Sequence, residues 1–160
     1  MIRRGGQHDV PFLRDMLRHA YYWRWAEPEL QDLPVSRYVE GWGRPGDRSL
    51  VVIERLHPVG AAWYRLFTAA EPGYGFVDEQ TPELTVAVVP SRRGQGYGDE
   101  LLTALLDQGR NDGYGQVSLS VEPDNPALHL YRRHGFETVA ERGGALVMLA
   151  ELREPTPGAG

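Results

Sequence analysis

The sequence predicts a mixed α/β fold made of a single domain over residues 1–153. Its 160 residues are 41% hydrophobic and 10% aromatic, a composition typical of one globular domain. A continuous apolar run of strand length, LTVAVVP at 84–90, is followed by a glycine-rich loop and then by a segment with helical spacing. The alternating segment QVSLSV at 116–121 completes this unit, which predicts two parallel strands joined by a right-handed crossover.

The first part of the chain predicts a strand and a helix. Residues 1–5 form a short strand, and Asp9 is the N-cap of the helix that follows. One face of this helix is apolar at helical spacing, with Phe12, Leu13, Met16, Leu17, Ala20 and Tyr21. The connection after it is rich in proline and glycine and holds a short second helix at 36–42.

Antiparallel strands are predicted before the parallel unit. Strands at 49–56 and 61–67 are joined by a turn at 57–60, where His-Pro-Val-Gly interrupts the apolar pattern. A loop at 69–82, which contains two prolines and two glycines, then leads into the apolar strand.

The C-terminal part predicts a helix and a second hairpin. The helix spans 126–134, and strands at 136–142 and 145–152 follow it, joined by a turn at 143–144. With the preceding strands they make a sheet of about six to seven strands with flanking helices. Residues 154–160, EPTPGAG, are expected to form a flexible tail.

The composition excludes several kinds of chemistry. All 17 basic residues are arginine, and the chain contains neither lysine nor cysteine. Without lysine there is no internal Schiff base with pyridoxal phosphate and no P-loop lysine. Without cysteine there is no disulfide, no thiolate metal site and no thiol nucleophile, and no other metal-ligand spacing is visible. The chemistry that remains uses hydroxyl, imidazole or carboxylate groups, or transfers a group directly between two bound substrates.

Charge and hydropathy predict the partners and the compartment. The net charge is −5 and there is no basic run, which argues against nucleic acid as a partner. The longest apolar runs are too short to span a bilayer, and the first residues do not resemble a secretory signal. We therefore expect a cytoplasmic protein with no membrane partner.

The loop after the apolar strand has a pattern suited to phosphate. It consists of Arg92, Arg93, Gly94, Gln95, Gly96, Tyr97 and Gly98. A loop that enters a helix N-terminus presents unpaired amides and the positive end of the dipole, and glycines let an anion approach the backbone. The two arginines add charge-assisted hydrogen bonds. The same glycines are equally compatible with a tight strand-to-helix turn whose arginines are solvated.

A dinucleotide is one ligand class that this loop suggests. Glu122 ends the next strand, where a ribose-binding acid is expected in a Rossmann fold. The glycine spacing, however, is GxGxG rather than GxGxxG. Fewer than forty residues follow Glu122, which is too few for the second half of a doubly wound sheet. The pattern therefore disfavours dinucleotide binding.

Two blocks of the sequence resemble the GNAT superfamily of acyl-CoA-dependent N-acetyltransferases. Arg93, Gly96 and Gly98 match that family's R/Q-x-x-G-x-G/A pyrophosphate loop. The block NPALHLYRRHGF at 125–136 is similar to its N-x-x-x-x-L-Y-x-x-x-G-F segment. The order and spacing of the blocks also fit, while the N-terminal third matches only in its pattern of elements.

The resemblance implies acetyl-CoA as cosubstrate and no metal. In the family the fourth and fifth strands, here 84–89 and 116–121, splay apart and hold the pantetheine arm between them. Strand backbone groups would bind the arm and polarise the thioester carbonyl, and loop amides would take the pyrophosphate. The cofactor-binding residues implied in this way are Ala87, Val88 and Val89 on the strand, Arg92 to Gly98 in the loop, and Asn125 where the next helix begins.

The resemblance also implies which residues move protons. Tyr131 would be the general acid for the leaving thiolate, although a tyrosine at this position also suits core packing. The base that accepts the amine proton is either Glu83, just before the central strand, or Glu122, and each also suits an ordinary surface carboxylate. Because no cysteine can form an acetyl-enzyme, we expect direct attack in a ternary complex.

The acceptor implied is a primary amine on an unidentified small molecule or peptide. Aromatic residues in the first 64 positions are candidates to line its pocket, since aromatic faces with nearby carboxylates suit a cationic amine. These residues are Trp23, Trp25, Trp42, Trp63, Tyr21, Tyr22 and Tyr64. A homodimer is compatible with the sequence. The alternative function is a non-catalytic acyl-CoA-binding or sensor domain.

Overall fold

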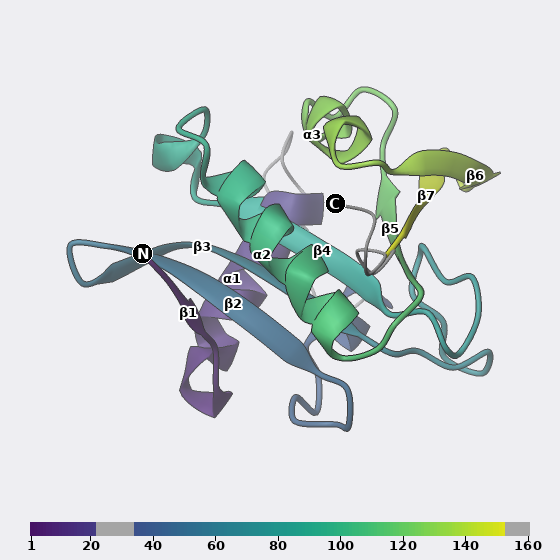
Figure 1. Cartoon of the computed structure of the whole chain (residues 1–160), viewed down its shortest axis with the longest axis horizontal. Coiled ribbons are helices and arrows are strands. Elements are labelled where there is room, and N and C mark those ends of the chain that lie inside the picture. Colours follow the sequence, from purple (N-terminus) through teal and green to yellow (C-terminus); the bar gives the residue numbers. More distant parts are fainter. Residues whose placement is uncertain (22–33, 153–160) are drawn as a thin grey trace, which may run out of the picture.

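The computed structural model describes residues 1–21 and 34–152, which form a seven-stranded mixed sheet with helices on both faces (Figure 1). The predicted tail at 154–160 lies outside the described residues, as do Tyr22, Trp23 and Trp25. The strands lie in the order β1-β2-β3-β4-β5-β7-β6. Their bounds are β1 (Ile2–Arg4), β2 (Arg48–Glu54), β3 (His57–Arg65), β4 (Glu83–Val88), β5 (Gln116–Val121), β6 (Glu137–Arg142) and β7 (Ala145–Glu151). The helices are α1 (Val10–Tyr21), α2 (Tyr97–Asn111) and α3 (Ala127–Arg133), with 3₁₀ turns η1 (Gln7–Asp9), η3 (Pro34–Tyr38) and η4 (Pro90–Arg92).

The predicted crossover is confirmed. α2 connects β4 to β5, which are parallel, while every other neighbouring pair in the described sheet is antiparallel. β4 and β5 pair at a single register position, Glu83 with Ser118, so the two strands separate toward their carboxyl ends. The central parallel pair is therefore splayed, as the family resemblance implied.

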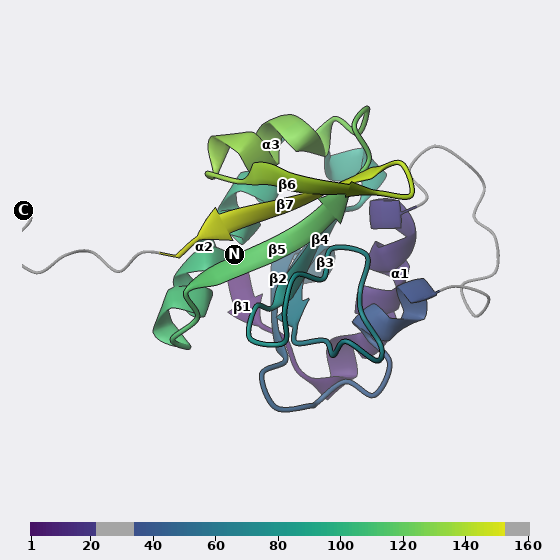
Figure 2. The same cartoon turned by 90° about the vertical axis from the view of Figure 1, so that its right-hand side faces the viewer.

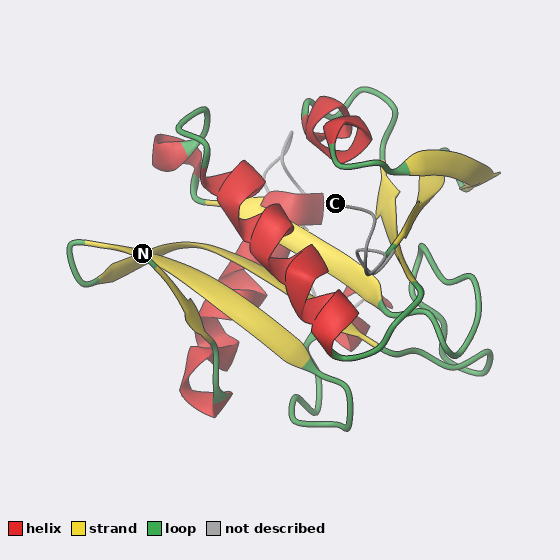
Figure 3. Cartoon of the chain, in the orientation of Figure 1, coloured by secondary structure: helices red, strands yellow, loops and turns green. Residues whose placement is uncertain are grey.

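Two apolar cores lie on opposite faces of the sheet, and the helices of Figure 3 cover them. The buried leucines of α2 pack on one face against Leu84 and Val86 of β4. α1 covers the other face, where it packs with Trp63 of β3 and Ala87 of β4. Because neighbouring residues of a strand point to opposite faces, β4 contributes to both cores. Figure 2 shows α1 and α2 on the two sides of the sheet.

The first hairpin turns earlier than the sequence predicted. β3 begins at His57, so the predicted turn at 57–60 is wrong and those residues belong to the strand. The turn is Arg55-Leu56, and both residues have positive φ, 50° and 71°. Two residues in this conformation match the twist of an antiparallel pair and allow a tight turn without glycine. Pro58 is accommodated near the start of β3, beside an irregularity in the pairing with β2.

The short helix predicted at 36–42 is instead the 3₁₀ turn η3, which ends at Tyr38. The buried guanidinium of Arg65 holds the segment after this turn. It donates to the backbone carbonyls of Arg37 at 2.8 Å and Glu40 at 2.6 Å. These bonds fix η3 against β3, and Tyr38 is consequently buried on the α1 side of the sheet.

Neither a membrane span nor a metal cluster occurs in the described ranges. Their helices lack the combination of length and apolar character that crossing a bilayer requires. Within residues 1–21 and 34–152, no three His, Asp or Glu side chains come together in a way that could hold a metal ion.

Candidate active site

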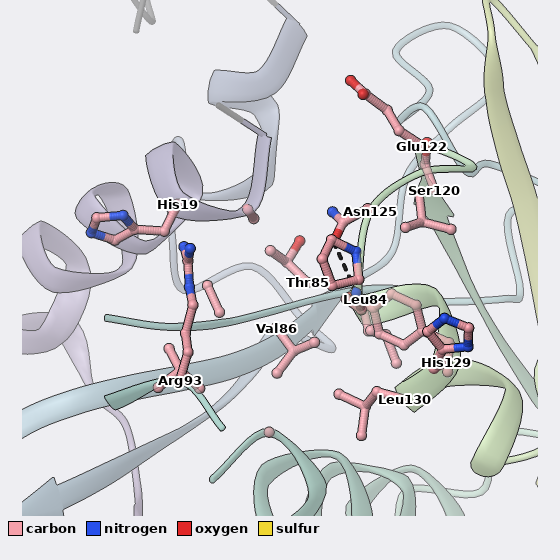
Figure 4. A pocket seen from close by; sticks show the side chains of 18 of the residues that line it. His19, Leu84, Thr85, Val86, Arg93, Ser120, Glu122, Asn125, His129 and Leu130 are labelled. Atoms are coloured by element: carbon pink, nitrogen blue, oxygen red, sulfur yellow. Dashed lines mark hydrogen bonds between the residues drawn. The ribbon is translucent and has the colours of Figure 1, made fainter. Parts of the chain in front are cut away.

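A cavity of about 820 Å³ opens where β4 and β5 separate (Figure 4). Its wall comes from α1, β4, the glycine loop and the start of α2, the end of β5, α3 and the β6–β7 hairpin. A volume of this size is typical of a small-molecule site. Glu83, Val89 and Gln95 are not among its lining residues. The predicted residues that do line it are Ala87, Val88, Arg92, Arg93, Gly94, Gly96, Tyr97, Gly98, Glu122, Asn125 and Tyr131.

The glycine loop has the geometry of an anion cradle. Gly94 and Gly96 have φ of 79° and 87°, and the space where a Cβ would stand is open at both. Among the described residues, the first amide after Gly94 to make a backbone hydrogen bond is that of Glu100, which donates to the carbonyl of Gly96 at 3.1 Å. The amides before it open the 15-residue helix α2, where the dipole is positive. This arrangement fits the predicted pyrophosphate.

Arg93 is the second arginine of this loop, and it lines the cavity. In Figure 4 its side chain extends from the loop toward His19 of α1, and both residues line the cavity. Within the described part of the chain it makes no ion pair or side-chain hydrogen bond. A guanidinium without a protein partner, at the edge of an amide cradle, fits a phosphate group.

Arg92, by contrast, is bound to the protein. Its Nε donates to Oε1 of Glu54 at 2.9 Å, and the hydroxyl of Tyr97 donates to Oε2 of the same carboxylate at 2.5 Å. These two hydrogen bonds lower the pKa of Glu54 and keep it charged. Because Glu54 ends β2, both sides of the glycine loop are tied to the sheet. The geometry therefore favours a supporting role for Arg92 over the predicted phosphate contact.

Alternate backbone groups of β4 face the gap. The amide of Val89 donates to the carbonyl of Val59 on β3 at 2.8 Å, and Ala87 pairs with β3 in the same register. Because backbone N–H groups alternate in direction along a strand, those of Val86 and Val88 point toward β5. β3 therefore uses the backbone groups of both Ala87 and Val89, which leaves Val88 as the predicted strand residue whose backbone faces the gap. Val86 also faces the gap, a position that the sequence did not reveal.

Asn125 and Gly98 lie where α2 and α3 meet the cavity. Oδ1 of Asn125 accepts the N–H of Ala127 at 2.9 Å and so caps the first turn of α3, as the dashed line in Figure 4 marks. Its Nδ2 has no hydrogen-bond partner among the described residues and remains for a ligand. A Cβ on Gly98 would lie 3.1 Å from Leu130, so this glycine lets the two helices approach.

Tyr131 packs in the core and also lies in the cavity wall. Its side chain is 7% exposed and packs edge-on against Phe136, with ring centroids 5.9 Å apart. It also lines the cavity. Burial raises the pKa of its hydroxyl well above the usual value near 10, so the group stays protonated through neutral pH. A protonated hydroxyl in the wall can donate a hydrogen bond to a leaving thiolate.

Glu83 lies at the apex, where β4 and β5 still pair. Its side chain is buried on the α1 side, beneath the loop 69–82 and behind the cavity wall. Oε2 accepts the hydroxyl proton of Tyr38, and Oε1 has no hydrogen-bond partner in the described chain. Burial raises the pKa of Glu83 to about 7, although Tyr38, the Gly75 amide and Arg142 favour the carboxylate. A carboxyl that titrates near pH 7 is suited to accept a proton.

Glu83 shares a face of β4 with Thr85 and Ala87, which both line the cavity. Glu83 therefore lies on the same face as these two residues, directly before the first residue of β4 that lines the cavity, Leu84. Glu122 is in the wall itself, at the end of β5, and its carboxylate points away from Thr85 in Figure 4. Both carboxylates stay candidates for the base.

The two predicted acceptor-pocket tryptophans that the structure describes, Trp42 and Trp63, do not line the cavity. Trp63 is fully buried, and its Nε1 donates to the carbonyl of Tyr38 at 3.0 Å. Trp42 packs against the guanidinium of Arg65 at 5.3 Å. Tyr64 belongs to the α2-side core. The described aromatic residues that do line the cavity are Tyr74, Tyr97 and Tyr131.

Several lining residues carried no local signal in the sequence. They are His19, Tyr74, Thr85, Ser120, His129 and Arg142. Thr85 and Ser120 lie inside segments predicted as strands, and only the splayed pairing exposes them to a cavity. The others reach it from a helix end, a loop and a hairpin, so no spacing along the chain could have grouped them.

A profile of the acetyltransferase (GNAT) family matches residues 10–136 of the chain. Over 146 residues the chain is 32% identical to the mycothiol acetyltransferase of Rhodococcus opacus (strain B4), an alignment that covers 85% of this chain and 44% of the relative. The chain thus spans less than half the length of the curated relatives that it matches first.

Two solved structures have the same fold. The ribosomal-protein-alanine N-acetyltransferase from Brucella melitensis is 26% identical and superposes with a TM-score of 0.68, covering 94% of this chain and 99% of that one. YncA, a putative acetyltransferase from Salmonella typhimurium with its cofactor acetyl-CoA, superposes with a TM-score of 0.73 at 24% identity, covering 98% and 95%. At this identity, the likeness to YncA shows the fold alone.

Proposed function

This chain belongs to the acetyltransferase (GNAT) family, and on that premise we propose that it transfers the acetyl group of acetyl-CoA directly to a primary amine. One observation carries the proposal: a single cavity joins a glycine loop suited to phosphate with a protonated tyrosine, and a buried carboxyl of pKa about 7 lies at its apex. In the reaction a C–N bond forms and the thioester C–S bond breaks. The amine loses a proton and the thiolate gains one.

Cofactor binding is assigned to the loop and to β4. Acetyl-CoA, when bound, supplies an acetyl group activated as a thioester. The amides of 94–98 and the guanidinium of Arg93 hold its pyrophosphate, a role supported by the open space at the two glycines. The amides of Val86 and Val88 face the gap and polarise the acetyl carbonyl there. Glu54 keeps the loop in place.

Proton transfer is assigned to Glu83 and Tyr131. An amine with a pKa near 10.4 is neutral in about one molecule in a few thousand at pH 7, so a base raises the reactive fraction. Glu83 takes the amine proton through water, because its carboxylate lies behind the wall. Tyr131 gives its hydroxyl proton to the thiolate. Without a cysteine in the chain, no thiol-bound acetyl-enzyme forms, and attack occurs in a ternary complex.

Free-thiol release from acetyl-CoA with a panel of amines tests this function. We expect acceptor-dependent release whose kcat/KM rises with pH through about 7, as Glu83 ionises. Glu83→Gln should lower kcat/KM at least about a hundredfold and abolish that rise. Glu122→Gln is the matched control and should retain both the wild-type kcat/KM and its rise with pH. If the two variants exchanged these behaviours, the base would be Glu122.

A non-catalytic acyl-CoA-binding or sensor domain is the alternative function. One observation favours it: Glu83 is behind the cavity wall rather than in it. Tight binding of acetyl-CoA with no thiol release above the acceptor-free rate, for every amine tested, would support the sensor and exclude the enzyme.

The relatives carry different names, mycothiol acetyltransferase in one case and ribosomal-protein-alanine N-acetyltransferase in another. For this chain we therefore propose as acceptor a primary amine on a small molecule or peptide. The names of the relatives do not identify the acceptor more closely. The cytoplasmic location and the homodimer stay predictions from the sequence.

A further inference from the structure

Arg142 is a cation of the cavity wall that lies away from the glycine loop. Arg142 ends β6, whereas the phosphate-binding groups belong to the loop before α2. Its Nη1 donates to the carbonyl of Phe76 at 2.6 Å. Its Nε and Nη2 have no hydrogen-bond or ion-pair partner among the described residues. The guanidinium therefore retains donors for a ligand.

The strand register places Arg142 beside the open end of β5. Arg142 pairs with Ala145 across the hairpin, and the next residue of β7, Leu146, pairs with Val121. Val121 and Ser120 line the cavity. The end of the β6–β7 hairpin thus lies at the carboxyl end of β5, where the gap between β4 and β5 is wide.

The loop 69–82 connects Arg142 to the apex. A Cβ on Gly75 would lie 2.6 Å from the carbonyl carbon of Leu119, so this loop lies directly on β5. Its Phe76 carbonyl binds Arg142, and the charge of Arg142 acts on the carboxyl of Glu83. The loop 69–82 thus joins the guanidinium of Arg142 to the apex, where Glu83 would reach the amine of the acceptor through water.

The charges at this end of the cavity are of opposite sign. Glu83 attracts an ammonium group, while Arg142 attracts an anion and repels a second cation. A polyamine would bring a second positive charge close to Arg142, which repels it. A zwitterion whose amine and carboxylate are a few bonds apart complements both signs.

We propose that the acceptor carries a carboxylate close to its amine, as an α-amino acid does, and that Arg142 binds this carboxylate. The proposal rests on the acetyltransferase function proposed above. The planar guanidinium presents paired donors that match a carboxylate, and a charge-assisted pair of this kind separates a carboxylate from its neutral amide by about tenfold to a hundredfold.

The test uses L-amino acids, each paired with its carboxamide. Thiol release gives kcat/KM for both members, and calorimetry in the presence of CoA gives their Kd values. The wild-type protein should favour the carboxylate at least about tenfold in both measurements. The carboxamide has the more easily deprotonated amine, so intrinsic reactivity opposes this preference.

Arg142→Gln retains a donor for the Phe76 carbonyl but removes the charge, and its preference for the carboxylate over the carboxamide should fall to about one. Arg142→Lys should retain part of it, and the exposed Arg132→Ala should retain all of it.

Two results would overturn the proposal. The first is a wild-type protein that binds both members of each pair equally. The second is an Arg142→Gln variant that loses both members to the same extent, because Arg142 would then act only by holding the loop. If no acceptor released thiol while the binding preference and its loss in Arg142→Gln persisted, the acetyltransferase function would fail and the carboxylate site would stand.

Discussion

The hydroxyl of Tyr38 donates a hydrogen bond to Oε2 of Glu83 and accepts the backbone N–H of Tyr74 at 2.8 Å. One phenol therefore connects η3, the apex of the splayed strands and the loop that covers it. Because the bond favours the charged carboxylate, Tyr38 works against the burial that raises the pKa of Glu83. Tyr38 is thus a positioning residue for the proposed base.

Replacing Tyr38 by Phe should shift the pH profile. Loss of a hydrogen bond to the charged form raises the pKa of Glu83 further, by about one unit for a bond of this kind. The acid limb of kcat/KM, expected near pH 7, should move to higher pH by that amount. Tyr131→Phe is the control and should leave the limb in place. An unchanged limb in Tyr38→Phe would show that Glu83 is not the group that titrates.

Replacing Glu83 by Gln should remove a pH dependence of stability. The pKa of Glu83 is raised in the folded protein to about 7, so the folded state binds more protons than the unfolded one between about pH 4.5 and 7. The contribution of Glu83 to the free energy of unfolding is complete below about pH 4.5. It falls by up to about 3 kcal/mol as the pH rises through 7.

Urea denaturation at pH 5 and pH 8 measures this contribution. The wild-type protein should lose free energy of unfolding between the two pH values, and Glu83→Gln should lose less. An equal loss in both proteins would mean that other groups cause it.

Replacing Tyr131 by Phe should lower kcat by about a hundredfold while leaving acetyl-CoA binding within about twofold, because general-acid catalysis acts only on the reaction step. The ring contact with Phe136 does not involve the hydroxyl, so the Tm should change little. Stopped-flow thiol release and calorimetry separate the two effects. A normal kcat with acetyl-CoA would assign Tyr131 to packing alone.

Arg93 and Arg92 should behave differently. Arg93→Ala should weaken CoA binding by about tenfold to a hundredfold and leave the binding of acetyl-pantetheine, which lacks the pyrophosphate, unchanged. Arg92→Ala and Glu54→Gln should each weaken CoA binding less, and the double variant should be no worse than the stronger single one, because both break one bond. Equal losses for CoA and acetyl-pantetheine in Arg93→Ala would contradict a phosphate contact.

Replacing Gly75 by Ala should lift the loop from β5. The new Cβ would lie 2.6 Å from the carbonyl carbon and 2.7 Å from the oxygen of Leu119, and the backbone cannot give way there. We expect a loss of about 1–3 kcal/mol in stability together with reduced turnover. Gly115→Ala, at a position with no neighbouring atoms, should be close to neutral. Similar behaviour of the two variants would argue against a close contact between the loop and β5.

Most elements of the fold could be predicted because their signals are local. The apolar run at 84–90, the leucine stripe of α2 and the alternation at 116–121 each report a period set by the neighbouring residues. The hairpin turn was placed at 57–60 because proline and glycine usually mark turns, but the Arg55-Leu56 conformation is selected by the twist of the paired strands. That pairing is not visible along the chain.

The sequence by itself determined the parallel crossover unit and the glycine loop proposed for the cofactor, since the groups proposed to hold a phosphate are consecutive backbone amides at one helix start. The tertiary structure alone decided the part of the site that is proposed for the acceptor. Tyr38, Glu83, Tyr74 and Arg142 come from a 3₁₀ turn, a strand, a loop and a hairpin, and they meet only because the loop 69–82 folds over the splayed strands. The pKa of Glu83 follows from the same packing, because burial exists only in the folded chain.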